Sequence, residues 1–95
     1  MAATPRQSAR PTVLVVDDEE LSREFVRAEL EEDHTVLAAA TAEEAFLLLD
    51  SEPVDLVLMD VIMPGTSGFE ACRQIRAKAV GAFLPILFLP ARNHF

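Results

Sequence analysis

The chain has 95 residues, of which 51% are hydrophobic and 25% are charged, with three glycines and six prolines. This length fits one domain and the composition is typical of a packed globular chain, so a two-domain arrangement and a disordered or collagen-like chain are excluded. A formal net charge of −8 argues against a protein that binds nucleic acid by neutralising its phosphates. We therefore expect no nucleic-acid partner.

The charges are unevenly distributed along the chain. Residues 13–60 carry fifteen acidic and two basic residues, whereas residues 61–95 carry one acidic and four basic residues. Such an acidic excess suits bound metal ions or a basic partner surface. The single cysteine cannot form an internal disulfide, the N-terminus lacks the apolar stretch of a secretory signal, and no apolar run is long enough to span a membrane. We therefore expect a cytoplasmic location and no membrane contact.

The first half of the chain predicts a strand, a helix and a second strand. Residues 1–11 have no apolar period and are expected to form a flexible lead to a domain at 12–95. Val13–Val16 is a continuous β-branched and aliphatic run, typical of a strand buried on both faces. Apolar residues at helical spacing among glutamates in 21–30 predict an amphipathic helix, and Thr35–Ala39 predicts a short strand.

A second helix and a third strand follow. Thr41 and Glu44 form a capping box for a helix through Leu49. Val54–Met59 is again almost entirely apolar, which predicts a buried strand, and it ends at the carboxylate of Asp60.

The last part of the chain completes an alternation of strands and helices. Ser67 and Glu70 form a second capping box for a helix through Lys78, and Leu84–Leu89 predicts a fourth strand. Alternation of helices with fully apolar strands predicts an α/β fold with a parallel sheet and helices on both faces. We expect the strand order 2-1-3-4 of flavodoxin-like sheets.

Carboxylates end two of the buried strands. Asp17 and Asp18 follow the first strand, and Asp60 follows the third. We expect them to converge, because the ligand site of an open parallel sheet lies beyond the carboxyl ends of its strands. Two carboxylates about 4 Å apart repel by roughly 4 kcal/mol at an effective dielectric near 20. Either the carboxyl groups take up protons, or a hard divalent cation bridges the oxygens, and an all-oxygen cluster favours Mg²⁺.

These acids have two other interpretations. Acidic residues at the start of a helix are often ordinary caps, but caps do not explain acids at the ends of two neighbouring strands. An aspartate beside Mg²⁺ suits phosphoryl transfer, with Asp60 as the nucleophile, Asp17 and Asp18 as metal ligands, and the backbone carbonyl of Ile62 as a further ligand. A phosphohydrolase is disfavoured because that class has another acid two residues after the nucleophile, where this chain has Ile62.

Three segments carry a resemblance to a known family. They are VLVVDDEE at Val13–Glu20, VDLVLMDVIMPGTSGFE at Val54–Glu70 and LPILFLPA at Leu84–Ala91. The chain resembles the receiver domain of two-component response regulators, the CheY-like fold. The resemblance implies that Asp60 is the phosphoacceptor, that Asp17 and Asp18 bind Mg²⁺, and that a sensor histidine kinase or a phosphotransfer protein donates the phosphoryl group.

The chain departs from the family pattern in two respects. Receivers usually have Thr or Ser at the end of the fourth strand, where this chain has Pro90, which offers neither a hydroxyl nor an N–H. The family also continues through a fourth helix, a fifth strand bearing a Lys and a fifth helix, whereas this sequence stops at Phe95, so we expect an incomplete receiver. We further expect partly exposed side chains on Val13–Val16 and Val54–Met59 and a bare fourth-strand edge that invites self-association.

These observations lead to two functional hypotheses. The first is a phosphoacceptor receiver domain that takes a phosphoryl group onto Asp60 with Mg²⁺ and is not a turnover enzyme. The alternative is a degenerate receiver that acts as a non-phosphorylated, metal-binding interaction module, which Pro90 favours because a hydroxyl at that position would bind the phosphoryl oxygens.

Overall fold

Four parallel strands and three helices alternate along the chain in this computed structural model, which describes residues 10–78 and 81–90. Most of the predicted lead at 1–11 and the last five residues lie outside the described ranges. The elements are β1 (Thr12–Val16), α2 (Glu20–Leu30), β2 (Thr35–Ala39), α3 (Ala42–Ser51), β3 (Leu56–Asp60), α4 (Gly68–Arg76) and β4 (Ile86–Leu89). The sheet order is β2-β1-β3-β4, which confirms the predicted α/β fold and strand order.

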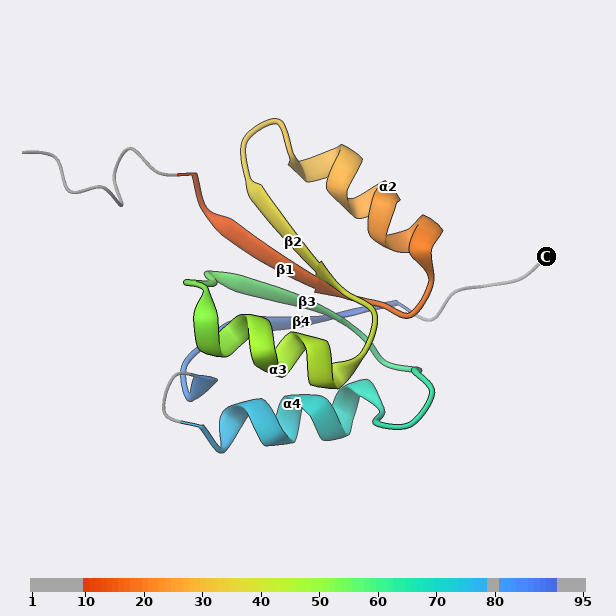
Figure 1. Cartoon of the computed structure of the whole chain (residues 1–95), viewed down its shortest axis with the longest axis vertical. Helices are drawn as coiled ribbons and strands as arrows, with labels where there is room; N and C mark the ends of the chain where they lie inside the picture. Colours follow the sequence, from red (N-terminus) through yellow and green to blue (C-terminus); the bar gives the residue numbers. More distant parts are fainter. Residues whose placement is uncertain (1–9, 79–80, 91–95) are drawn as a thin grey trace, which may run out of the picture.

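The helices cover the two faces of the sheet unequally. Figure 1 shows α2 on one face, and α3 and α4 side by side on the other. The main core lies between the sheet and this helix pair, and its members are buried apolar side chains from β1, β2, β3, α3 and α4, including Leu14, Val16, Val57, Met59, Ala45, Ala71 and Ile75. No helix in the described residues has the length and apolar character needed to cross a membrane.

The expected partial exposure is found in β3, where Leu56 and Leu58 are partly exposed, but not in β1. Val13–Val16 are at most 2% exposed, so the prediction that part of this strand would be exposed was wrong. The reason is that α2 packs against β1 and β2. The exposed apolar side chains are instead Leu21 and Phe25 of α2, at 79% and 67%, and Leu87 of β4, at 56%.

The two predicted capping boxes differ in how completely they form. Thr41 Oγ1 accepts from the N–H of Glu44 at 3.1 Å, and the Glu44 carboxylate returns to the N–H of Ala40 at 2.7 Å. Ser67 Oγ accepts from the N–H of Glu70 at 3.2 Å, but the Glu70 carboxylate turns toward Arg73. Both caps satisfy an N–H that the first turn of a helix leaves without an intrahelical partner.

The third and fourth strands begin two residues later than predicted. Asp55 caps the start of β1, because its carboxylate accepts from Thr12 N–H at 2.7 Å while its own N–H donates to Thr12 O at 2.8 Å. The regular β3 ladder therefore starts at Leu56. Leu84 N–H donates back to Gly81 O at 3.4 Å in a turn, so the β4 ladder starts only after Pro85.

Candidate functional site

Three aspartates meet at the carboxyl end of the sheet, as the strand order predicted. Asp17 and Asp18 follow β1, Asp60 ends β3, and β1 pairs directly with β3. One carboxylate oxygen from each aspartate lies within 4.8 Å of the other two. Residues more than forty positions apart in the sequence therefore form one acidic cluster, which we call the aspartate site.

Asp17 and Asp60 are held in place by the backbone that follows them. Asp17 is 2% exposed, and its Oδ1 accepts from the N–H of Glu19 at 2.9 Å. Asp60 is 4% exposed, and its Oδ1 accepts from the N–H of Ile62 at 3.3 Å. Each buried carboxylate thus receives an N–H from two residues further on, which fixes its orientation before any ligand arrives.

Asp18 differs from the other two because its side chain is the more accessible one. A cluster with two buried carboxylates and one reachable from solvent allows a hydrated cation to enter. It also means that Asp18 can be replaced with little effect on the core, whereas Asp17 cannot.

The three carboxylates are the kind of ligand that Mg²⁺ prefers. All three side chains are carboxylates, and hard divalent cations prefer oxygen. Oxygens that share one octahedral Mg²⁺ at about 2.1 Å are roughly 3–4 Å apart, so the oxygens would move closer by up to about 1–2 Å to share one ion. Such a cation would also offset the repulsion among three anions in a largely buried site.

The loop after Asp60 lies tightly against the end of β3. Gly68 N–H donates to Val61 O at 2.8 Å, and a Cβ at Gly68 would overlap the carbonyl oxygen of Asp60 and lie 2.9 Å from Val61 Cα. Gly65 has a φ of 80°, a conformation that glycine adopts without strain. These two glycines allow the loop to turn back toward the aspartate site. The side chain of Ile62, in the same loop, is 68% exposed.

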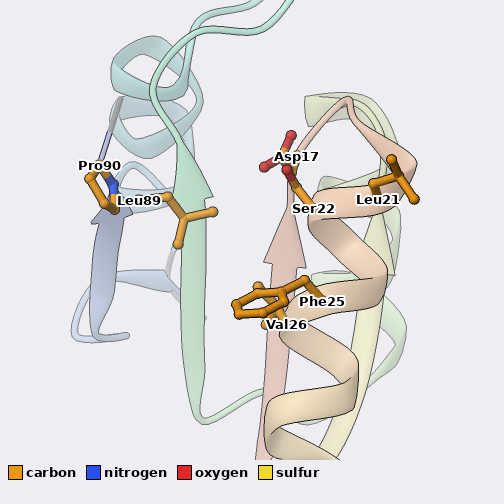
Figure 2. A pocket seen from close by; sticks show the side chains of 7 residues that line it. All are labelled: Asp17, Leu21, Ser22, Phe25, Val26, Leu89 and Pro90. Atoms are coloured by element: carbon orange, nitrogen blue, oxygen red, sulfur yellow. The ribbon is translucent and has the colours of Figure 1, made fainter. Parts of the chain in front are cut away.

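An apolar groove of about 430 Å³ leads up to the aspartate site. Figure 2 shows Phe25 and Val26 of α2 on one side, Leu89 and Pro90 on the other, and Asp17 at one end. Pro90 therefore lies at the rim next to the acids, at the position where the family resemblance implied a hydroxyl.

One basic residue near the aspartate site was not predicted. Arg23 Nη1 donates to the backbone carbonyl of Asp17 at 2.9 Å, which brings a guanidinium to the end of β1. The sequence signal is only an arginine six residues after an aspartate on an acidic helix, and it does not distinguish a solvated side chain from one that folds back onto the strand.

The chain is similar in sequence to a known protein family and to several of its members. The family model described as the response regulator receiver domain matches residues 13–94. The chain is 42% identical over 84 residues to the transcriptional regulatory protein YvrH of Bacillus subtilis, an alignment that covers 86% of this chain and 34% of that protein. The chain thus spans about a third of the length of the curated relatives that it matches.

Solved structures show the same fold. A response regulator receiver protein from Pseudomonas putida superposes with a TM-score of 0.80 at 37% identity, covering 85% of this chain and 68% of that one. The receiver domain of the sensor histidine kinase PA1611 from Pseudomonas aeruginosa superposes with a TM-score of 0.81 at 30% identity, covering 87% and 69%. In that structure a magnesium ion is coordinated in the active-site cleft.

Proposed function

This chain belongs to the response regulator receiver domain family, and from this premise we propose that it accepts a phosphoryl group on Asp60 during two-component signalling. The donor would be a phosphohistidine of a sensor kinase or of a phosphotransfer protein. An Asp60 carboxylate oxygen attacks the phosphorus, the bond between phosphorus and the imidazole nitrogen breaks, and the leaving imidazole takes up a proton. The product on this chain is an aspartyl phosphate.

The meeting of the three carboxylates within 4.8 Å at the end of two adjacent strands carries this proposal. Asp60 suits the nucleophile, because it ends β3 and an N–H from Ile62 orients it at 3.3 Å. Asp17, Asp18 and Asp60 would hold Mg²⁺ together with the backbone carbonyl of Ile62. The ion would supply positive charge to the phosphoryl oxygens, which is the main requirement of phosphoryl transfer.

Exposed apolar side chains beside the aspartate site suit a protein donor. Leu21 of α2 is 79% exposed and comes three residues after Asp18, and Ile62, in the loop after β3, is 68% exposed and comes two residues after Asp60. A protein that presents a phosphohistidine to Asp60 would approach close to both. We infer that these two side chains contact the donor protein and exclude water around the reacting atoms.

Pro90 limits the rate expected for this reaction. A hydroxyl at the end of β4 would donate to a phosphoryl oxygen, and losing one such donor costs roughly 2.7–4 kcal/mol of transition-state stabilisation. Thr66 does not replace it in the present conformation, because its hydroxyl donates to Glu43 Oε2 at 3.5 Å. We therefore expect phosphorylation of Asp60 to be slow.

A small phosphodonor tests the proposal directly. Acetyl phosphate and Mg²⁺ should give a species one phosphoryl group heavier by intact-mass spectrometry, and chelation of the metal should prevent it. Asp60→Asn should abolish the adduct. Asp50→Asn is the matched control, because Asp50 is an exposed aspartate of α3 with a side chain 58% accessible, and this variant should label like the parent protein.

The second candidate is a metal-binding interaction module without phosphotransfer, which Pro90 favours. The two functions separate in one experiment. An adduct that Asp60→Asn removes supports the phosphoacceptor, whereas a thermal shift with Mg²⁺ but no adduct, under conditions that label a related receiver, supports the module. Relatives such as YvrH, AfsQ1 and ResD are transcriptional regulatory proteins, and neither candidate function involves catalytic turnover of a substrate.

A further inference from the structure

The turn from β1 into α2 is held by hydrogen bonds to both the backbone and the side chain of Asp17. Its N–H donates to Ala39 O of β2 at 3.1 Å, and its Oδ1 accepts from the N–H of Glu19 at 2.9 Å. Its carbonyl oxygen accepts from Arg23 Nη1 at 2.9 Å. Because Arg23 lies one turn into α2, this last bond ties the helix to the end of the strand.

The carbonyl that Arg23 contacts belongs to the peptide between two aspartates of the site. A peptide group is planar and moves as one unit, so a bond that fixes the carbonyl oxygen of Asp17 also fixes the direction in which the chain enters Asp18. Asp17 is buried, whereas Asp18 carries the more accessible carboxylate of the cluster. The bond from Arg23 therefore acts on the position of two of the three carboxylates.

The amino end of α2 is anchored differently from those of α3 and α4. Those two helices begin after Thr41 and Ser67, whose hydroxyls accept a backbone N–H of the first turn. α2 begins after Glu19, whose carboxylate accepts from a serine hydroxyl instead. The connection between α2 and the end of β1 includes the Glu19 N–H and the Arg23 side chain, which both bond to Asp17.

We propose that Arg23 is a positioning residue of the aspartate site, which sets the affinity for Mg²⁺ by holding the peptide between Asp17 and Asp18. This role rests on the proposed function, because it takes the metal to bind at the aspartate site. Replacing a group that bonds to a metal ligand without touching the ion typically lowers the metal affinity by about 10–100-fold. We expect the lower end of that range, because Arg23 bonds to the backbone of a ligand and not to its carboxylate.

The charge of Arg23 acts in the opposite direction to its hydrogen bond. A guanidinium stays protonated at neutral pH, so it partly neutralises the three acids and repels a divalent cation at the same site. Removing the charge alone would strengthen Mg²⁺ binding, whereas removing the hydrogen bond alone would weaken it. The sign of the change in affinity therefore distinguishes a positioning residue from a counter-ion.

Arg27 provides a matched control on the same helix. It lies one turn after Arg23, and its Nη1 donates at 3.0 Å to the carbonyl of Val36, at the outer edge of β2. Val36 pairs in register with Val13, which precedes Asp17 by four residues, or roughly 13 Å along the strand. Both arginines thus tie α2 to strand backbone through one Nη, but Arg27 does so far from the acids.

Titrations of the 95-residue chain with Mg²⁺, followed by amide NMR well below the melting temperature, test the proposal. Arg23→Met keeps an apolar stem but removes the charge and the donor, and it should bind Mg²⁺ about 10-fold more weakly than the parent chain. Arg27→Met should bind with parental affinity. Parental or tighter binding in Arg23→Met, or an equal loss in both variants, would overturn the proposal.

Arg23→Lys separates geometry from charge. It keeps the positive charge but replaces the planar guanidinium with a single point donor on a shorter stem. A difference in Mg²⁺ affinity between this variant and the parent chain therefore reports on hydrogen-bond geometry, also where Arg23→Met does not fold. We expect an affinity between those of the parent chain and Arg23→Met. An affinity equal to that of the parent, or no higher than that of Arg23→Met, would contradict the role of the hydrogen bond.

The amide of Asp18 reports on the position of the peptide directly. Its N–H belongs to the peptide that Arg23 holds, so in the absence of Mg²⁺ its resonance should shift in Arg23→Met and stay in place in Arg27→Met. Loss of stability alone would not produce this difference. An Asp18 resonance that is unchanged in Arg23→Met would count against positioning.

Loss of phosphorylation and loss of the Arg23 effect are separate outcomes. A parent chain that binds Mg²⁺ but forms no aspartyl phosphate would contradict the phosphoacceptor function, while the role of Arg23 would still be decided by the affinities. Parental Mg²⁺ affinity in Arg23→Met would overturn that role alone. A parent chain that binds no Mg²⁺ would overturn the metal site and the role of Arg23 together.

Discussion

Each carboxylate of the aspartate site contributes in a different way. Asp17 and Asp60 are buried and oriented by the N–H groups of Glu19 and Ile62, so their replacement changes both the site and the end of a strand. Asp18 is more accessible, so its replacement mainly removes one negative charge and one potential metal ligand. This makes Asp18 the best position at which to separate metal binding from folding.

Mg²⁺ should raise the melting temperature of the parent chain at neutral pH, because a ligand that binds only the folded state stabilises it. The gain is about 2.7 kcal/mol when the free ion is 100-fold above its Kd. Asp18→Ala should remove most of this increase, and Asp50→Ala should keep it. Thermal unfolding followed by circular dichroism, with Ca²⁺ and Mg²⁺ titrated separately, measures the effect. An equal shift in Asp18→Ala would place the cation elsewhere.

Restoring a hydroxyl at the end of β4 should accelerate labelling. In Pro90→Thr the new side chain lies at the rim of the groove beside Asp17, where it can donate to a phosphoryl oxygen on Asp60. We expect acetyl phosphate to label this variant up to roughly 10²-fold faster than the parent protein. Pro90→Val, which has a similar shape but no hydroxyl, is the control and should label at the parental rate. Equal rates for Thr and Val would show that the hydroxyl has no part.

A surface ion pair on α4 has a clear pH signature. The pKa of Glu70 is lowered from 4.5 to about 2, chiefly by its hydrogen bond with Arg73, whose Nη2 lies 2.5 Å from Glu70 Oε2. A carboxyl with a depressed pKa stabilises the folded state above pH 4.5 and loses this contribution as the pH falls toward 2. Carbon-detected NMR titration of the Glu70 carboxyl should show a midpoint near its lowered pKa of about 2. Arg73→Ala should move it upward, and Lys78→Ala should not.

At the scale of the elements, the turn from β3 into α4 depends on close backbone contact. Gly68→Ala should destabilise the fold by about 1–3 kcal/mol, because the added Cβ overlaps the backbone of Asp60 and forces the strand end or the helix start to move. The same movement should weaken Mg²⁺ binding. Gly65→Asn is the control, since no atom lies within 4 Å and asparagine tolerates a positive φ. Chemical denaturation and Mg²⁺ titration of both variants test the difference.

Some features of the strands and helices could be predicted from the sequence, and others could not. The convergence of Asp17 and Asp60 was predictable, because each follows a fully apolar run and parallel strands end at the same edge. The exposure of Phe69 and the bonds from Arg27 and Asp55 to strand backbone were not predicted. These features depend on the three-dimensional arrangement of the strands, because a long or polar side chain bonds to whichever backbone group lies within its reach once the sheet has formed. No local sequence pattern encodes such contacts.

At the scale of the whole molecule, the sheet is covered more fully on one face than on the other. Two helices pack over one face, whereas α2 alone covers β1 and β2 on the opposite face (Figure 1). The space beside α2 is the groove between Phe25 and Leu89 (Figure 2). Of the two strands predicted to be partly exposed, Val13–Val16 is sheltered, because α2 packs over it, whereas Val54–Met59 keeps Leu56 and Leu58 partly exposed.

The hydrogen bond from Arg27 to the outer carbonyl of β2 bears on how this edge of the sheet meets other chains. A guanidinium that occupies Val36 O takes up an acceptor that an incoming strand would need. Arg27 therefore ties α2 to the strand that it covers and disfavours strand addition at that position.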